Sequence, residues 1–226
     1  ESAGEAIKPL VGAETAVIPL QNGIDAPDRL IPILGPKAVM GGVAQISASI
    51  AAPGVIRQVG TFMRMIFGEL DDTRSRRAEG FLALCQKAGF HATLREQIVP
   101  ELWMKFILLA TNAGITAATR QPIGRLRDDP DIRPVMTDAF EEVIAVARAR
   151  GVPLPADALA KVLDFIDHAP PAMKASMALD LERGNRLELP WLSGKVVELG
   201  RKFGIPTPTH GMMYAMLKPY ITGNPA

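Results

Sequence analysis

The sequence contains 226 residues, of which 48% are hydrophobic and 22% are charged. This length suits one large domain or two modest ones, and the apolar content allows a sizeable core. Basic residues number 25 and acidic residues 24, so charge gives no reason to expect binding to nucleic acid or to an anionic membrane. The single cysteine, Cys85, excludes an intramolecular disulfide and fits a reducing compartment, so we expect a cytoplasmic protein.

The first part of the sequence alternates helix-like and strand-like runs, which is typical of an α/β fold. The chain has no initial methionine and starts as if inside a helix, so we expect it to be the later part of a longer protein. We predict the second half of a doubly wound domain, with an antiparallel edge, over residues 1–95. The expected helices are 4–11, 27–34 and 73–89, and Gly89 is the expected stop of the last one. The expected strands are 15–21, 38–50, 54–60, 63–70 and 90–95, of which 54–60 and 63–70 form an antiparallel pair flanking Gly60.

From Ile98 onward the strand patterns disappear, and long helical patterns are separated by proline-rich turns. We therefore predict an all-helical second domain over residues 96–226. The longest apolar stretch, 106–118, contains two threonines and an asparagine and is shorter than the roughly 20 residues of a spanning helix. We expect no membrane span.

The stretch Val17–Asp25 indicates a strand, a tight Gln-Asn-Gly turn and a following helix. In an open α/β sheet, ligands bind at the carboxyl ends of strands, so Asn22 is a candidate ligand contact. An ordinary turn explains the same residues. Pro19 weakens the strand prediction, because proline removes a ladder donor.

The segment 100–120 is apolar nearly all the way round and should form a buried helix, yet it carries Lys105. Helical spacing places Leu109, Asn112 and Thr116 on the same face as Lys105. An ammonium, a carboxamide and a hydroxyl on one stripe favour a site for an anionic, carbonyl-bearing ligand. The alternative is that Lys105 extends along the helix to solvent near the helix start.

A second polar cluster occupies residues 174–204. Ser176 and Asp180 are four residues apart and share a helical face, which Gly184 interrupts. Glu188 stands among apolar residues and needs a partner or a raised pKa. A glutamate stabilised by the dipole of the following helix is an equally good explanation. The three histidines show no ligand spacing, so we predict no metal site.

Four passages, at 17–25, 101–106, 175–189 and 192–210, resemble the 2-dehydropantoate 2-reductase (ketopantoate reductase) family in order and spacing. The resemblance implies a partial Rossmann-type sheet followed by an all-α C-terminal domain of the 6-phosphogluconate dehydrogenase C-terminal-like type. It also implies that the family's GxGxxG half is absent from this sequence. The implied activity is NADPH-dependent reduction of a 2-oxo acid, ketopantoate to pantoate, in pantothenate biosynthesis.

The resemblance also implies roles for individual residues. Lys105 matches the lysine that binds the substrate oxo group and donates a proton, and Glu188 matches the glutamate near that lysine and the nicotinamide ribose. Ser176 matches the serine that binds the substrate carboxylate. Asn22 and Ala48 match contacts to the cofactor.

The sequence departs from the family pattern at three substrate asparagines, which are replaced by Leu109, Ala113 and Ile123, while Asn112 lies one place earlier than the second. Two alternatives stay open. The replacements leave open a reductase of the same fold that acts on a more apolar oxo compound. The missing phosphate loop leaves open a non-catalytic dimerising or binding domain. The implied partner is a small 2-oxo acid, and a homodimer is compatible with the pattern.

Overall fold

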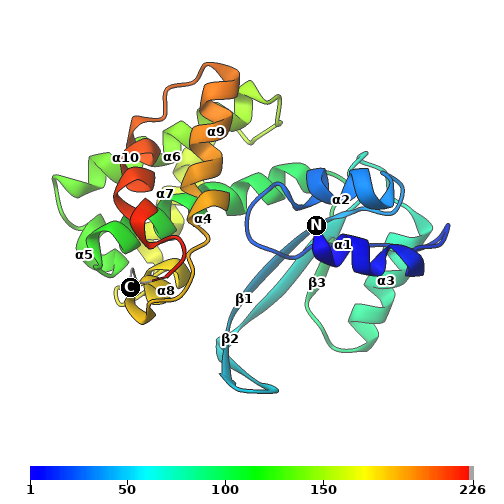
Figure 1. Ribbon diagram of the computed structural model, residues 1–226. Coiled ribbons are helices and arrows are strands. Elements are labelled where there is room, and N and C mark those ends of the chain that lie inside the picture. Colours follow the sequence, from blue (N-terminus) through cyan, green and yellow to red (C-terminus); the bar gives the residue numbers. More distant parts are fainter. Residues whose placement is uncertain (224–226) are drawn as a thin grey trace. The chain divides into compact units, whose positions relative to one another are not determined.

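The computed structural model describes residues 1–223, and the side chains of residues 59, 61 and 62 fall outside that description. Contacts divide the chain into two compact units, Glu1–Leu102 and Trp103–Ala226 (Figure 1). The first unit combines helices with a small sheet, and the described part of the second is helical. This confirms the α/β class followed by an all-α part. The domain limits at residues 95 and 96 stay a prediction.

The first unit contains a three-stranded sheet in the order β1-β2-β3. Strands β1 and β2 pair antiparallel, and β2 and β3 pair parallel, which is the mixed sheet expected for a Rossmann-type half with an antiparallel edge. The elements of this unit are α1 (Ser2–Ile7), η1 (Lys8–Leu10), α2 (Ala26–Leu34), β1 (Gly41–Ala52), β2 (Val55–Gly68), α3 (Arg76–Lys87) and β3 (Ala92–Leu94).

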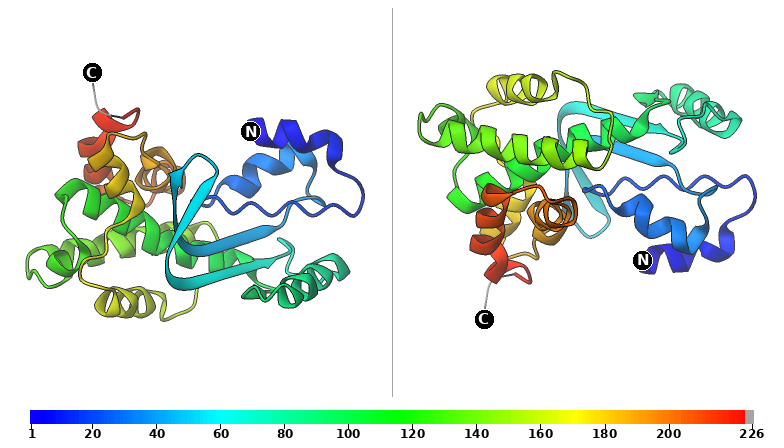
Figure 2. Two further views of the ribbon diagram at one scale, coloured as in Figure 1. Left: turned by 90° about the horizontal axis from the view of Figure 1, so that it is seen from below. Right: turned by 90° about the horizontal axis from the view of Figure 1, so that it is seen from above.

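The strand pair predicted to flank Gly60 is wrong. Residues Val55–Gly68 form one continuous strand, β2, and the hairpin turn lies at Gly54, whose φ is 75° (Figure 2). Gly60 also has a positive φ, 73°, and lies where the register jumps from Ile46 opposite Met63 to Ala48 opposite Gln58. Glycine serves turns and bulges for the same steric reason, so local sequence does not distinguish them.

The strand predicted over residues 15–21 is reduced to one bridge. Val17 lies parallel to Val39, with Val17 N donating to Ala38 O at 2.7 Å and Met40 N donating to Val17 O at 3.0 Å. Pro19 follows two residues later and has no N–H with which to continue the ladder. A Cβ atom on Gly42 would lie 2.8 Å from Pro19 O, so the glycine lets this segment pass close to β1.

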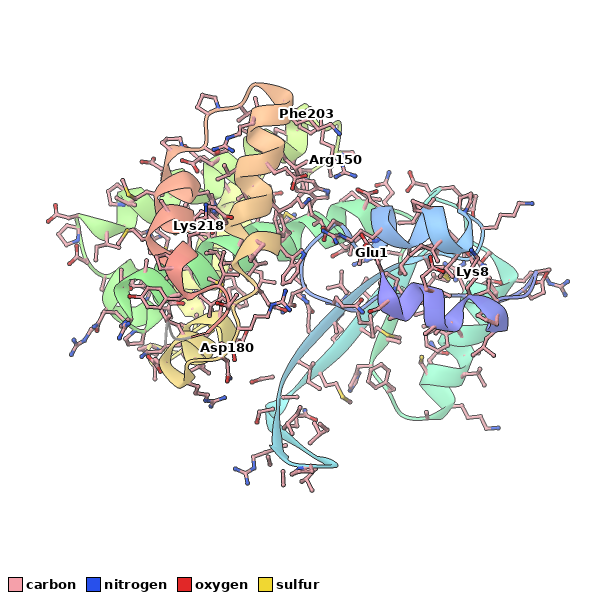
Figure 3. All side chains as sticks on the ribbon, viewed as in Figure 1. Glu1, Lys8, Arg150, Asp180, Phe203 and Lys218 are labelled. Atoms are coloured by element: carbon pink, nitrogen blue, oxygen red, sulfur yellow. The ribbon has the colours of Figure 1, made fainter. Side chains whose placement is uncertain are left out.

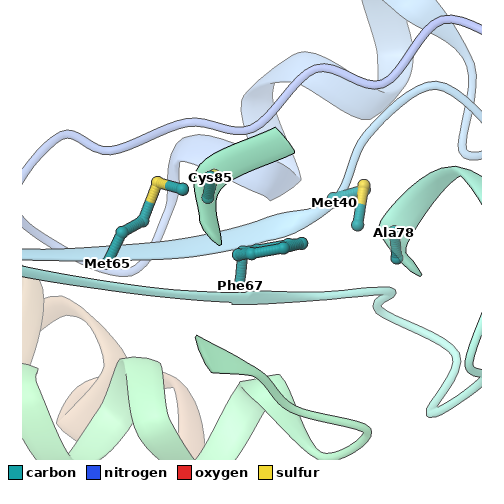
Figure 4. Packing of buried hydrophobic residues seen from close by; sticks show 5 residues of the cluster. All are labelled: Met40, Met65, Phe67, Ala78 and Cys85. Carbon is teal, nitrogen blue, oxygen red and sulfur yellow. The ribbon is translucent and has the colours of Figure 1, made fainter. Parts of the chain in front are cut away.

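The core of the first unit is formed where α3 covers the sheet (Figure 4). The rings of Phe67 and Phe81 meet edge to face with centroids 5.1 Å apart. Cys85 is buried in this core, as expected for a small apolar residue. Helix α3 begins at the Ser75 cap and is followed by Gly89 at a φ of 69°, the predicted stop.

The second unit is built around α4, and its helices α6, α9 and α10 pack against one another (Figure 1). Helix α4 begins in the first unit and continues into this one. The elements are α4 (Ile98–Thr119), α5 (Ile123–Arg127), α6 (Ile132–Ala149), α7 (Ala158–His168), α8 (Ser176–Arg183), η2 (Leu189–Trp191), α9 (Ser193–Phe203), α10 (Pro208–Leu217) and η3 (Lys218–Tyr220).

Helix α4 has 22 residues, more than the apolar stretch recognised in the sequence, because it begins earlier, at Ile98. By length and composition α4 could cross a membrane, since its most apolar 18-residue stretch has a mean hydropathy of 1.3. In the structure, 56% of that stretch is buried inside the protein. Burial of this extent is typical of the central helix of a helical domain.

Candidate functional site

A polar stripe runs along one face of α4 and becomes more buried toward the C-terminal end of the helix. Lys105 is half-buried, Asn112 is 7% exposed, and Thr116 is 1% exposed. Burial lowers the pKa of Lys105 below its usual value, and the charge of Glu188 opposes that shift. Lys105 therefore lies in an environment that disfavours its charge, with a carboxylate of the same unit acting on it.

Glu188 is held by its apolar neighbours. Leu187 and Leu189 are 1% and 0% exposed, and Leu187 N donates to Ile221 O at 3.0 Å. Glu188 caps the short helix η2, and its carbonyl accepts a hydrogen bond from Trp191 N at 2.9 Å. Helix α9 begins five residues later, at Ser193, so the dipole of α9 does not start at Glu188.

Asn112 carries an unpaired acceptor. Its Oδ1 atom is buried without a hydrogen-bond partner, as is Oγ1 of the adjacent Thr111. Thr116 donates to the backbone carbonyl of Asn112 at 2.6 Å, which leaves the carboxamide oxygen unsatisfied. A buried acceptor without a donor costs about 1–3 kcal/mol, so such an atom needs an explanation. A ligand hydroxyl would supply the missing donor.

Ser176 is exposed at the first position of α8, whose N-terminus has no side-chain cap. Asp180, labelled in Figure 3, shares the helical face of Ser176, but its carboxylate accepts from Asn185 Nδ2 at 3.1 Å. Gly184 ends the helix at a φ of 72°, as the sequence predicted. The hydroxyl of Ser176 and the first N–H groups of α8 form an arrangement that suits a carboxylate.

The two predicted cofactor contacts lie in the first unit. Asn22 is half-buried in the turn that follows the Val17 bridge, and Gly23 has a φ of 95° there. Ala48 is exposed on β1, opposite Gln58 and next to the bulge. Their cofactor roles stay predictions, as do the roles of Lys105 and Glu188.

A buried polar cluster, which no sequence pattern revealed, joins α6, α9 and α10. His210 is 0% exposed, with Nε2 3.1 Å from Ala139 O and Nδ1 3.2 Å from Ser193 Oγ. Burial lowers the pKa of His210 to about 4. The carboxylate of Glu142 accepts hydrogen bonds from the backbone N–H groups of Thr209 and His210 at 2.7 and 2.9 Å. These partners are too distant in sequence for any local pattern to reveal.

Within residues 1–223, no group of three or more histidine, cysteine, aspartate or glutamate side chains could hold a metal ion.

Comparison with known families decides the family. Residues 97–221 match Ketopantoate reductase PanE/ApbA C terminal, and residues 1–72 match Ketopantoate reductase PanE/ApbA. The chain belongs to the ketopantoate reductase family. A 2-dehydropantoate 2-reductase of Mesorhizobium japonicum is 29% identical over 235 residues, which cover 94% of this chain and 70% of that protein.

Solved structures agree with this family assignment. The crystal structure of a PanE/ApbA family ketopantoate reductase from Ralstonia eutropha JMP134 is 31% identical, with a TM-score of 0.86, and covers 97% of this chain and 71% of that one. A D-mandelate dehydrogenase solved with NADH also has a TM-score of 0.86, but at 19% identity it shows only that the fold is shared. The ketopantoate reductases are oxidoreductases, and we assign this chain to that enzyme class.

The sequence predicted that three residues stand where the ketopantoate reductase pattern has asparagines, and the structure shows that these three residues differ in exposure. Ala113 and Ile123 are 1% and 0% exposed, and Ile123 N donates to Met173 O at 2.9 Å. Leu109 is half-buried one helical turn after Lys105. Of the three, Leu109 is therefore the replacement with accessible surface on the Lys105 stripe.

Proposed function

We propose that this chain carries the substrate-binding and proton-donating residues of an NADPH-dependent reductase that converts a 2-oxo acid to a 2-hydroxy acid. Ketopantoate, reduced to pantoate in pantothenate biosynthesis, is the proposed substrate. The observation that carries the proposal is Lys105, half-buried on an apolar helix with Glu188 acting on its charge and an unpaired carboxamide oxygen further along the same stripe. The family assignment supports the same chemistry.

In this proposal, the Lys105 ammonium donates a hydrogen bond to the substrate oxo group. NADPH supplies a hydride to the oxo carbon when it is bound. As negative charge develops on the oxygen, Lys105 transfers a proton to it, which is general acid catalysis. Glu188 favours the protonated form of Lys105 before that step. Ser176 and the N-terminus of α8 bind the substrate carboxylate, and the Asn112 oxygen accepts a hydroxyl hydrogen of the substrate.

The residues of the first unit fit the nicotinamide end of such a cofactor. The Asn22 carboxamide stands in a turn at the carboxyl end of a segment that runs parallel to its neighbour, where α/β sheets bind ligands. The backbone of Ala48 on β1 is the second proposed contact. The 226 residues contain no GxGxxG sequence, so these contacts do not include a phosphate-binding loop. We also propose a cytoplasmic location and keep a homodimer as a proposal.

A second candidate is a reductase of the same fold that acts on a more apolar oxo compound. Leu109 favours it, because an aliphatic side chain one turn from Lys105 offers no hydrogen bond to a polar substrate group. Both candidates need Lys105 as the acid.

The test is steady-state kinetics of the intact protein, following NADPH absorbance with ketopantoate and less polar 2-oxo acids. We expect Lys105→Ala to lower kcat by roughly 100-fold or more with every substrate, the usual range for loss of a general acid. Lys161→Ala is the matched control, because Lys161 is exposed on α7. Near-normal kcat in folded Lys105→Ala, checked by circular dichroism, would remove the support for a reductase and leave the binding-domain alternative.

A further inference from the structure

Ser193 and His210 form a buried hydrogen-bonded pair whose proton positions follow from their partners. The Ala139 carbonyl only accepts hydrogen bonds, so His210 Nε2 carries the hydrogen that it donates over 3.1 Å. In the neutral ring, Nδ1 is then the acceptor, and it receives the Ser193 hydroxyl hydrogen over 3.2 Å. Both residues are 0% exposed, so water does not replace a lost partner. The pair joins the first residue of α9 to α6 and α10.

The same serine lies against the backbone of α4. A Cβ atom on Gly114 would come within 3.0 Å of Ser193 Oγ and 2.6 Å of Met213 Sδ, so glycine is what allows this approach. Gly114 lies two residues beyond Asn112 on the helix that also carries Lys105. The position of Ser193 therefore limits where this part of α4 can lie.

Ser193 is also tied to the segment that carries Glu188. Only Leu192 separates Ser193 from η2, and both Leu192 and Leu189, the first residue of η2, are 0% exposed. A Cβ atom on Gly194 would lie 3.1 Å from Leu189 O, so the first turn of α9 rests against η2. A shift of Ser193 would also displace η2 and Glu188, which precedes η2, because the protein interior is close-packed.

We propose that Ser193 and His210 are positioning residues. They hold α4 and the Glu188 segment in the arrangement in which the Glu188 carboxylate stabilises the charge of Lys105. This inference rests on the proposed function, because it gives Lys105 and Glu188 their catalytic task. Neither Ser193 nor His210 touches the substrate in this scheme. Glu142 supports the pair from α6 by accepting the backbone N–H groups that begin α10.

Two substitutions approach the contact from opposite sides. Ser193→Ala removes the hydroxyl with little change in volume, and Gly114→Ala inserts a methyl group between α4 and Ser193. In the intact protein we expect each to lower kcat by roughly fivefold, comparable to the loss of one hydrogen bond. We also expect the basic limb of the pH–rate profile to move to lower pH, since a displaced Glu188 no longer supports protonated Lys105.

Gly211→Ala is the matched control, because it makes the same change one residue from His210 where a Cβ atom meets nothing within 4 Å. We expect it to leave kcat and the basic limb unchanged. If Ser193→Ala and Gly114→Ala lower only the melting temperature, the pair is merely structural and the proposal is wrong. A shift of equal size in Gly211→Ala also contradicts it.

Lys105→Ala, assayed in parallel, separates this inference from the proposed function. Normal turnover by Lys105→Ala would overturn the function itself. The positioning role alone is overturned if Lys105→Ala loses turnover while Ser193→Ala and Gly114→Ala keep an unchanged kcat and an unchanged basic limb. If Ser193→Ala does not fold, Gly114→Ala gives the same readout from the other side.

Discussion

Lys105 and His210 are both titratable groups whose pKa is lowered by burial, but their surroundings give them different consequences. Lys105 is half-buried, and Glu188 opposes the effect of burial. His210 is completely enclosed, and this burial favours the neutral ring. Its hydrogen bond to the Ala139 carbonyl opposes that effect on the pKa but fixes the orientation of the ring. The lysine is suited to exchange a proton with a ligand, and the histidine is suited to hold helices together.

Replacing Glu188 tests the charge that supports Lys105. In Glu188→Gln we expect the basic limb of the kcat/KM profile to move to lower pH. Lys105 must be protonated to act as the acid, and without the charge of Glu188 burial lowers the pKa of Lys105 further. Glu198→Gln, an exposed change on α9, is the control and should leave the limb in place. An unmoved limb in folded Glu188→Gln would show that Glu188 does not act on the titrating group.

The lowered pKa of His210 predicts how the stability of the protein depends on pH. The His210 pKa is about 4 in the folded state against 6.5 for an unperturbed histidine, so between these values the unfolded chain binds a proton that the folded chain does not. Stability is therefore lost as pH falls from about 6.5 toward 4. We expect this residue to account for about 2 kcal/mol of unfolding free energy lost between pH 7.5 and pH 5.

Urea unfolding at the two pH values, compared with His210→Gln, measures that contribution. The variant should be less stable at pH 7.5, because it loses a fitted buried side chain, but its stability should fall less on acidification. An equal fall in both proteins would mean that His210 is protonated in the folded state or that other groups dominate.

At the scale of elements, a glycine in β2 and a glycine in α3 differ in whether the structure has room for a side chain. A Cβ atom on Gly68 would lie 2.0 Å from the backbone oxygen of Arg95, while one on Gly80 would meet nothing within 4 Å. Gly68 is required by the close passage of the chain past the end of β2. Gly80 lies inside α3 with no contact that requires it.

The same substitution should therefore change stability in opposite directions. We expect Gly68→Ala to cost at least about 1–3 kcal/mol, because a backbone atom cannot turn away as a side chain can. Gly80→Ala should stabilise by about 0.5–1 kcal/mol, since alanine loses less backbone entropy in a helix. Thermal and urea unfolding of both variants check the pair, and destabilisation by Gly80→Ala would contradict the reasoning.

At the scale of the whole molecule, the two candidate functions differ in substrate preference, and Leu109 is the residue that we propose to test. A hydrogen-bonding site rejects analogues that lack the matching group, whereas an aliphatic wall separates substrates only weakly. If the second candidate function holds, the intact protein should favour less polar 2-oxo acids over ketopantoate. Leu109→Asn should raise the kcat/KM ratio of ketopantoate to an apolar 2-oxo acid by roughly 10-fold, the size of one recovered hydrogen bond.

Competition assays with NADPH measure this ratio in the two proteins. Leu84→Asn is the control, because Leu84 is 64% exposed on α3 and the change should leave the ratio as it is. A clear preference for ketopantoate in the unchanged protein would show that Asn112 and other groups replace the missing amide.

The sequence by itself determined the class of the fold, an α/β part followed by an all-helical part. Helical periodicity located α4 and its polar stripe, and Gly89 and Gly184 were recognised as helix stops. The stripe with Lys105 and Asn112 was visible because residues of one helix face recur at a local spacing.

Tertiary structure decided what depends on contacts between distant residues. Pairing with β1 decides that β2 continues through Gly60, and pairing with Val39 leaves only a single bridge at Val17. The effect of Glu188 on Lys105, 83 positions away, and the enclosure of His210 by α6 and α9 have no local signature. Periodicity reports which face of an element is apolar, but burial and pairing are properties of the packed chain, where segments far apart in sequence remove one another from water.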